Sequence, residues 1–333
     1  MPFQDCLSRG RLETASSRNT ENFPGKEAET LLEMLRETAI LPRESAFSLP
    51  LKLQHKSDSG LKADHALEKN RTDFMDILAL NGKAWEEKAR RKNPWTVPVD
   101  HEIIARARRG DWSIMLTASR PAPRAWFPPV KDKNILCLAS GGGQQGPVLA
   151  AAGADVTVLD LSEAQLERDR AVARREGLEI RTVLSSMTDL CMFADNYFDI
   201  IVHPVSNLFI PHIQPVWNEA FRVLKKGGVL MSGFMNPAFY LFDWELQEQD
   251  ILQVSHPLPY SDLDYRSMEE LAQDHEAAEF GHSLEEQIQG QLAAGFVLTA
   301  LYEDTFGGTR LPDRFFPSFL ATRAVKLQRA SSY

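Results

Sequence analysis

The chain contains few cysteines and no long apolar segment. Its three cysteines, Cys6, Cys137 and Cys191, share no CxxC or Cys/His spacing among the 333 residues, so the sequence predicts no metal site. No apolar run approaches the ~18 residues that cross a bilayer, and the amino-terminal segment is too polar for a signal peptide. These absences predict a cytoplasmic protein.

Positive charge is also in deficit. The sequence has 37 Lys and Arg against 46 Asp and Glu, a formal net charge of −9. An acidic surface repels phosphate backbones and anionic lipids, which disfavours nucleic acid and the membrane as partners. The imbalance is strongest in residues 241–290, which hold 13 Asp or Glu and a single Arg, Arg266. Such a segment, placed over a ligand site, suits a neutral or cationic molecule.

Three regions of different character follow one another. Residues 1–71 are polar with short apolar clusters and are predicted to form a largely disordered extension, in which residues 1–70 could serve as an arm for a protein partner. Residues 72–130 predict a helical cap, with one helix over 73–90 and another that Asp100 begins and that runs to about Arg109. Residues 131–333 predict the core, with a long insertion at 235–294.

Strand and helix patterns alternate through this core. Apolar runs joined by helical crossovers predict a parallel sheet covered on both faces. The last two strands have no helix between them and therefore predict an antiparallel hairpin. The expected fold class is α/β, a doubly wound, mainly parallel seven-stranded sheet with a C-terminal antiparallel hairpin and an N-terminal helical cap. The predicted strands are 134–139, 155–159, 180–184, 198–203, 228–234, 295–303 and 318–326.

A glycine-rich turn follows the first predicted strand. Three consecutive glycines begin at Gly141, and Gly146 is followed by Pro147, which suits the first turn of a helix. Asp160 ends the second strand, where a carboxylate can accept the hydroxyls of an adenosine ribose. The spacing Gly141-x-Gly143-x-x-Gly146 also matches the dinucleotide fingerprint. The turn therefore predicts nucleoside binding but leaves two cofactor classes open.

Later segments bear on this choice. Residues 195–203 place an acidic residue before an apolar strand, and residues 219–231 give a helix, a basic turn, a Gly-Gly break and a buried strand before the terminal hairpin. Together these motifs resemble the class I, Rossmann-like family of S-adenosylmethionine-dependent methyltransferases, especially its small-molecule type. The resemblance covers roughly residues 73–328 and implies S-adenosyl-L-methionine as the cofactor.

Carried over by position, the resemblance implies a set of cofactor-binding residues. It places the turn beside the methionine part, one acidic residue on the ribose, and the remainder at the adenine or at the reacting methyl group. The implied residues are Ala139, Ser140, Gly141, Gly142, Gly143 and Gln144 (turn), Asp160 (ribose), Leu161, Ser186 and Met187 (adenine), and His203 and Ser206 (methyl group). Three positions depart from the family pattern: Cys137 and Ser186 stand where acidic residues are common, and Ala139 stands where glycine is common.

Catalysis needs a base only if the acceptor loses a proton. His203 is the first candidate because it ends a strand at the edge where open α/β sheets bind ligands. His256 and Tyr260 are further candidates, since they lie in the insertion, which could cover the site as a lid.

The expected function is transfer of a methyl group from S-adenosylmethionine to O, N, S or C of a small, neutral or cationic acceptor. One alternative is an NAD(P)-dependent oxidoreductase. Another is a non-catalytic, cofactor-binding regulatory or scaffold protein of methyltransferase descent.

Overall fold

The computed structural model describes the backbone of residues 58–327 and the side chains of residues 73–327. The chain divides into two compact units, residues 1–65 and 66–333, and the contacts described below belong to the second. Most of the predicted extension and partner-binding arm lies outside the described residues.

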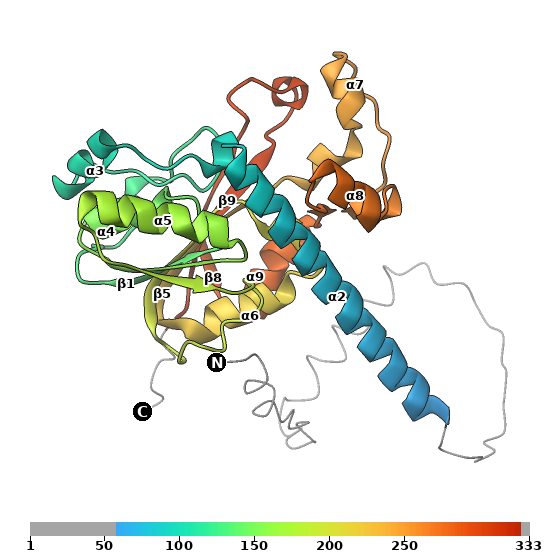
Figure 1. Ribbon diagram of the computed structural model, residues 1–333, viewed down its shortest axis with the longest axis horizontal. Coiled ribbons are helices and arrows are strands. Elements are labelled where there is room, and N and C mark those ends of the chain that lie inside the picture. Colours follow the sequence, from blue (N-terminus) through green and yellow to red (C-terminus); the bar gives the residue numbers. More distant parts are fainter. Residues whose placement is uncertain (1–57, 328–333) are drawn as a thin grey trace, which may run out of the picture. The chain divides into compact units, whose positions relative to one another are not determined.

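A seven-stranded sheet forms the centre of the second unit (Figure 1). Its strand order is β3-β2-β1-β4-β5-β9-β8. The five strands from β3 to β5 in this order pair in parallel, whereas β9 pairs antiparallel with both β5 and β8. This confirms the predicted mainly parallel sheet and its terminal hairpin. The strands are β1 (Asn134–Leu138), β2 (Asp155–Asp160), β3 (Ile180–Leu184), β4 (Phe198–His203), β5 (Leu224–Met235), β8 (Val297–Asp304) and β9 (Phe319–Val325).

Helices cover both faces of this sheet because its central strands are apolar on both sides. In β1, Ile135 and Cys137 join a core cluster with residues of α3, α4 and α5, while Leu136 and Leu138 join the cluster of α6 and α2 on the other face. Successive side chains of a strand point to opposite faces, so one short run serves two cores. The helices are α2 (Asp58–Arg90), α3 (His101–Arg108), α4 (Gln145–Ala151), α5 (Glu163–Glu176) and α6 (Gln214–Val223).

Local signals explain where these helices begin and end. The Asp100 side chain accepts the Ile103 N–H and starts α3, as predicted. Ser162 caps α5 in the same way, and Gly177, with φ 65°, closes it. The helix predicted over 73–90 is present but begins earlier, at Asp58, so the expected boundary at 71/72 falls inside α2. Residues 58–72 contain many good helix formers and no proline, which allows the helix to continue.

The insertion at 235–294 follows the carboxyl end of β5, and its last part returns to the sheet, where Gln291 bonds Thr322 of β9 and Gly290 packs on Trp217 of α6. It contains the two-stranded ribbon of β6 (Tyr260–Ser261) and β7 (Phe280–Gly281). A capping box of Ser283 and Glu286 opens its last helical segment. Its helices are α7 (Trp244–Glu248), α8 (Met268–Asp274) and α9 (Gly290–Ala293), the last preceded by a π-helical turn, η6 (Glu285–Gln289).

Within residues 58–327, no helix is both long enough and apolar enough to cross a bilayer.

Candidate functional site

The glycine-rich turn joins β1 to α4 at the carboxyl edge of the sheet. Three successive backbone N–H groups of the turn point towards carboxylates of the protein itself. The Gly141 N–H donates to Asp160 Oδ2 at 2.8 Å, and those of Gly142 and Gly143 both donate to Asp169 Oδ2 at 3.0 Å. The turn is therefore held from behind by two carboxylates.

The glycines are required by close packing as well as by conformation. A Cβ atom at Gly141 would lie 2.7 Å from Gln165 Cβ, and one at Gly146 would lie 2.6 Å from Val158 Cγ2. Helix α5 and strand β2 thus approach the turn more closely than any side chain permits. Beside them, Ala139 adopts a φ of +47°, in the left-handed region that favours glycine.

Polar side chains fasten the rest of the turn. Ser140 is buried, and its hydroxyl donates to Gln145 Oε1 at 3.2 Å. The amide of Gln144 donates to the Val97 carbonyl, and that of Gln145 donates to the Met115 carbonyl. The segments before β1 therefore contact the turn from outside.

Asp160 lies at the end of β2 and beside the turn because β1 and β2 pair in register. Its half-buried carboxylate accepts the N–H groups of Gly141 and Ser162. Burial raises its pKa, which these N–H donors oppose, and the nearby Glu86 carboxylate raises it further. Asp160 thus has the position that the ribose assignment requires.

Helix α2 covers this end of the sheet. Glu86 Oε1 accepts the Ser162 hydroxyl and the Ala164 N–H, both at 2.9 Å, and so caps α5 from a neighbouring helix. A Cβ atom at Gly82 would lie 3.6 Å from the Leu161 side chain. Helix α2 therefore covers Leu161, the residue assigned to the adenine.

Asp169 is a site residue that the sequence analysis missed. Its side chain is fully buried on α5, and Oδ1 has no hydrogen-bond partner among the residues that the structure describes. Burial raises its pKa to about 7, against the opposing effect of the Gly143 and Gly142 N–H groups. A signal existed in the sequence, because Asp169 lies three residues after Leu166 and three before Val172 on the buried face of the helix.

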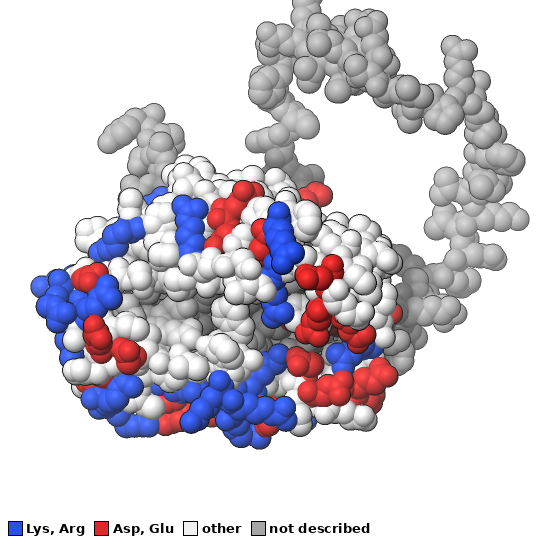
Figure 2. All heavy atoms as spheres, turned by 90° about the horizontal axis from the view of Figure 1, so that it is seen from above, with Lys and Arg blue, Asp and Glu red and all other residues white. Residues whose placement is uncertain are grey.

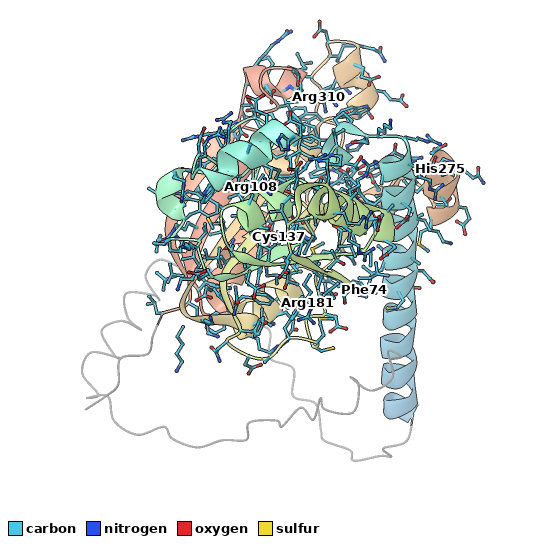
Figure 3. All side chains as sticks on the ribbon, turned by 60° about the vertical axis from the view of Figure 1, so that its left-hand side comes forward. Phe74, Arg108, Cys137, Arg181, His275 and Arg310 are labelled. Atoms are coloured by element: carbon cyan, nitrogen blue, oxygen red, sulfur yellow. The ribbon has the colours of Figure 1, made fainter. Side chains whose placement is uncertain are left out.

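Cys137 stands where the family often has an acidic residue, and it lies deep in the core between the sheet and its helices (Figure 3). Burial raises the pKa of its thiol, and the charge of Asp169 raises it further. The negative charge near the turn therefore comes from α5 instead of β1.

The charge beneath the turn bears on the choice of cofactor. A dinucleotide site presents free N–H groups to a pyrophosphate. Here the N–H groups of Gly141, Gly142 and Gly143 are bound by the carboxylates of Asp160 and Asp169, which would repel an anion. The turn suits a ligand with positive charge.

His203 ends β4 next to β1, as predicted, but its side chain is fully buried. Nδ1 lies 2.9 Å from the Leu138 carbonyl oxygen, and Nε2 lies 2.6 Å from the side-chain amide of Asn207. Burial lowers the pKa of His203, and these two bonds oppose the shift. Both ring nitrogens face oxygens that only accept, the Leu138 carbonyl and Asn207 Oδ1, so the ring donates to them, while burial disfavours the doubly protonated form.

The other residues assigned to the methyl group and the adenine follow the ends of β4 and β3 in the chain. The Ser206 hydroxyl donates to the Pro204 carbonyl at 3.0 Å, directly after β4. Ser186 is buried beyond β3 and bonds the Thr188 hydroxyl, while Met187 packs in the core cluster shared with Leu138.

His256 and Tyr260 lie together in an aromatic cluster of the insertion. The Tyr260 ring stacks between Tyr240 and Tyr265, with centroid distances of 5.0 and 5.6 Å, and the His256 ring contacts Tyr260 and Tyr265. The Tyr260 hydroxyl donates to Asp262 at 2.7 Å, and burial and this carboxylate raise its pKa. Tyr240 packs with Val205 and Leu208, which connects the cluster to the segment after His203. The roles assigned to His203, His256 and Tyr260 stay predictions.

Comparisons with known proteins agree with this geometry. A family model described as "Methyltransferase domain" matches residues 136–232, from β1 into β5. The "Uncharacterized methyltransferase YbaJ" of Bacillus subtilis is 53% identical over 254 residues, which are 75% of this chain and 99% of that protein. The "Ubiquinone/menaquinone biosynthesis C-methyltransferase UbiE" of Zymomonas mobilis is 36% identical over 102 residues, 30% of this chain and 41% of that protein. A solved structure from Listeria monocytogenes, a putative S-adenosylmethionine dependent methyltransferase, covers 62% of this chain and 96% of its own at 17% identity and a TM-score of 0.48.

The chain belongs to a family of methyltransferases. It is an enzyme. Membership in this methyltransferase family replaces the nicotinamide alternative that the glycine spacing left open.

Proposed function

We propose that the enzyme methylates a small, neutral or cationic acceptor at the carboxyl edge of β1, β2 and β4. The observation that carries the proposal is the pair of carboxylates, Asp160 and Asp169, that holds the turn after β1. Negative charge at this edge suits the sulfonium and ammonium groups of the cofactor.

The residues at this edge fit S-adenosylmethionine. Asp160 would accept its ribose hydroxyls, and Leu161, Ser186 and Met187 would surround its adenine. The turn from Ala139 to Gln144 would lie beside its methionine part. A Cβ atom at Gly141 would come within 3.0 Å of Asp160 Oδ2, so the glycine keeps the ribose carboxylate and the turn in direct contact.

The sulfonium of the bound cofactor supplies an activated methyl group. The protein's contribution is then to orient the acceptor for in-line transfer and to exclude water. The insertion and α2 are placed for the second task, because the Asn81 side chain of α2 bonds the Phe209 and Ala278 carbonyls and so joins the cap, the segment after β4 and the insertion. His203 would take a proton from the acceptor only if the hydrogen bond between its Nε2 and Asn207 broke.

The charge of the insertion supports the acceptor class. In Figure 2, Asp and Glu gather on the side where Figure 1 shows α8, whereas Lys and Arg gather on the side of α3. Thirteen acidic residues and one arginine between residues 241 and 290 disfavour a polyanion such as nucleic acid near this edge.

Titration calorimetry tests the cofactor assignment. Asp160→Ala should weaken binding of S-adenosylhomocysteine by about 1.5–3 kcal/mol, the scale of charge-assisted hydrogen bonds. Glu167→Gln is the control, because Glu167 is an exposed carboxylate of α5 that pairs with Arg170 and Arg174. Binding of NAD with no binding of S-adenosylhomocysteine would refute the assignment.

Transfer of a labelled methyl group to a panel of amines, phenols, thiols and carboxylates tests the acceptor class. We expect turnover with neutral or cationic members. Turnover confined to anionic acceptors would contradict the proposal.

A further inference from the structure

Asp169 is a buried acid with an unusual set of partners. It lies in the second turn of α5, and one of its oxygens accepts both the Gly142 and the Gly143 N–H at 3.0 Å. Both glycines have positive φ, 116° and 73°, so their N–H groups turn inward to the same atom. This carboxylate therefore determines the path of the backbone between β1 and α4.

A carboxylate in this place is costly for stability. The side chain is fully buried, Oδ1 has no partner, and a Cβ atom at Gly146 would lie 3.1 Å from Oδ1. The titratable groups that face it are the Cys137 thiol on β1 and the Asp160 carboxylate on β2, and neither supplies a positive charge. An apolar side chain would fill the same space without the cost of burying a charge. The feature that an apolar side chain would lose is the pair of bonds to the turn.

We propose that Asp169 is a positioning residue that holds Gly142 and Gly143 in the conformation that receives the methionine part of the cofactor. It supplies from α5 the negative charge that Cys137 does not supply from β1. The inference rests on the proposed binding of the cofactor at this turn.

Asp169 acts by determining which backbone groups of the turn face the ligand. With the N–H groups bound to Asp169, the turn does not present them to an incoming anion. A protonated Asp169 is a weaker acceptor, so the turn should loosen as the pH falls through about 7, the pKa that burial gives this group. Asp160 also has a raised pKa, with Glu86 behind it, and contributes its own pH dependence.

The test is calorimetric binding of S-adenosylhomocysteine to the full-length enzyme from about pH 6 to about pH 8, a range that brackets this pKa. Asp169→Asn keeps the size and one acceptor oxygen but removes the charge, and Asp169→Ala removes both. Glu176→Gln is the matched control, because Glu176 is a buried carboxylate at the other end of α5 that binds His101 and Arg175. A purely structural role would lower the stability of all three variants without separating their affinities.

We expect Asp169→Asn to bind about tenfold more weakly than the wild type at the upper pH, the effect of one charged hydrogen bond. Its affinity should depend less on pH than that of the wild type, while Glu176→Gln follows the wild type. Asp169→Ala should bind more weakly still. An Asp169→Asn affinity within about twofold of the wild type, with an unchanged pH profile, would overturn the inference. Failure of the wild type itself to bind would overturn the proposed function instead.

Discussion

Replacement of His203 by Asn separates two roles for this residue. The ring connects the end of β1 to the segment after β4, because its nitrogens contact the Leu138 carbonyl and the Asn207 amide. Asn207 in turn bonds Gln287 in the insertion at 2.9 Å. Nε2 faces Asn207 Oδ1, so the ring donates to Asn207, and the Asn207 amide N–H donates in turn to Gln287 Oε1. His203→Asn keeps a donor for Leu138 and removes the contact with Asn207.

The cost follows from the burial of these groups. Loss of one buried hydrogen bond, with Asn207 Oδ1 left without its donor, should lower the free energy of unfolding by about 1–3 kcal/mol. The smaller side chain also leaves a cavity beside Trp217, whose ring centroid lies 6.1 Å from that of His203. We therefore expect a total loss of about 2–4 kcal/mol at pH 8, where the histidine is neutral in both states.

The pH dependence gives the sharper measurement. The unfolded histidine has a pKa of about 6.5, and burial lowers that of the folded one. Between the two values the unfolded state binds a proton that the folded state does not, so the wild type loses stability as the pH falls below about 6.5, by up to about 1.4 kcal/mol per pH unit. The variant lacks this group, and the stability difference between the two proteins should shrink as the pH falls. His282, whose pKa burial also lowers, is present in both proteins and cancels from the difference.

Urea denaturation at a series of pH values measures this difference. A difference that stays constant or grows towards low pH would show that the folded His203 is protonated, contrary to the lowering of its pKa by burial. Turnover adds the catalytic readout. If the ring also takes a proton from the acceptor, turnover should fall about 100-fold while affinity for S-adenosylhomocysteine stays within a few-fold.

Two further substitutions test the surroundings of the site. Ala139→Gly should raise the free energy of unfolding by up to about 1 kcal/mol, because glycine adopts the φ of +47° without strain, and a lower melting temperature would contradict this. Glu86→Ala should lower it by about 1–2 kcal/mol through loss of the cap on Ser162 and Ala164, and it should lower the pKa of Asp160 by removing a neighbouring charge. Thermal denaturation and titration of Asp160 by NMR measure the two effects, and an unchanged Asp160 pKa would show that α2 does not cover the site in solution.

Periodicity predicted the sheet well because burial on both faces leaves long apolar runs in the sequence. The order of strands and helices, the terminal hairpin and the caps at Asp100, Ser162 and Ser283 follow from local patterns. The early start of α2 was not predicted, since residues 58–71 are mostly polar and were assigned to the extension.

The residues of the candidate site also include some that the sequence predicted and some that it did not. Asp160 and the glycines were predicted because they lie directly after strands, and parallel strands bring their carboxyl ends together. Asp169 was missed because helix α5 is rich in charged residues: its spacing from Leu166 and Val172 predicts burial, but the contact with the turn is visible only in the structure. The catalytic candidates depended on which side chains face the acceptor, a property that sequence position does not contain.

The sequence by itself determined the fold class and the order of strands and helices along the chain, because both depend on spacing along the chain, whereas the ribose role of Asp160 stays a prediction. Only the tertiary structure showed that three backbone N–H groups of the turn point inward to Asp160 and Asp169, and that His203 is enclosed by Leu138 and Asn207. Hydrogen bonds between residues far apart in the chain depend on how helices and strands pack, and burial then changes the charge and basicity of the groups they connect.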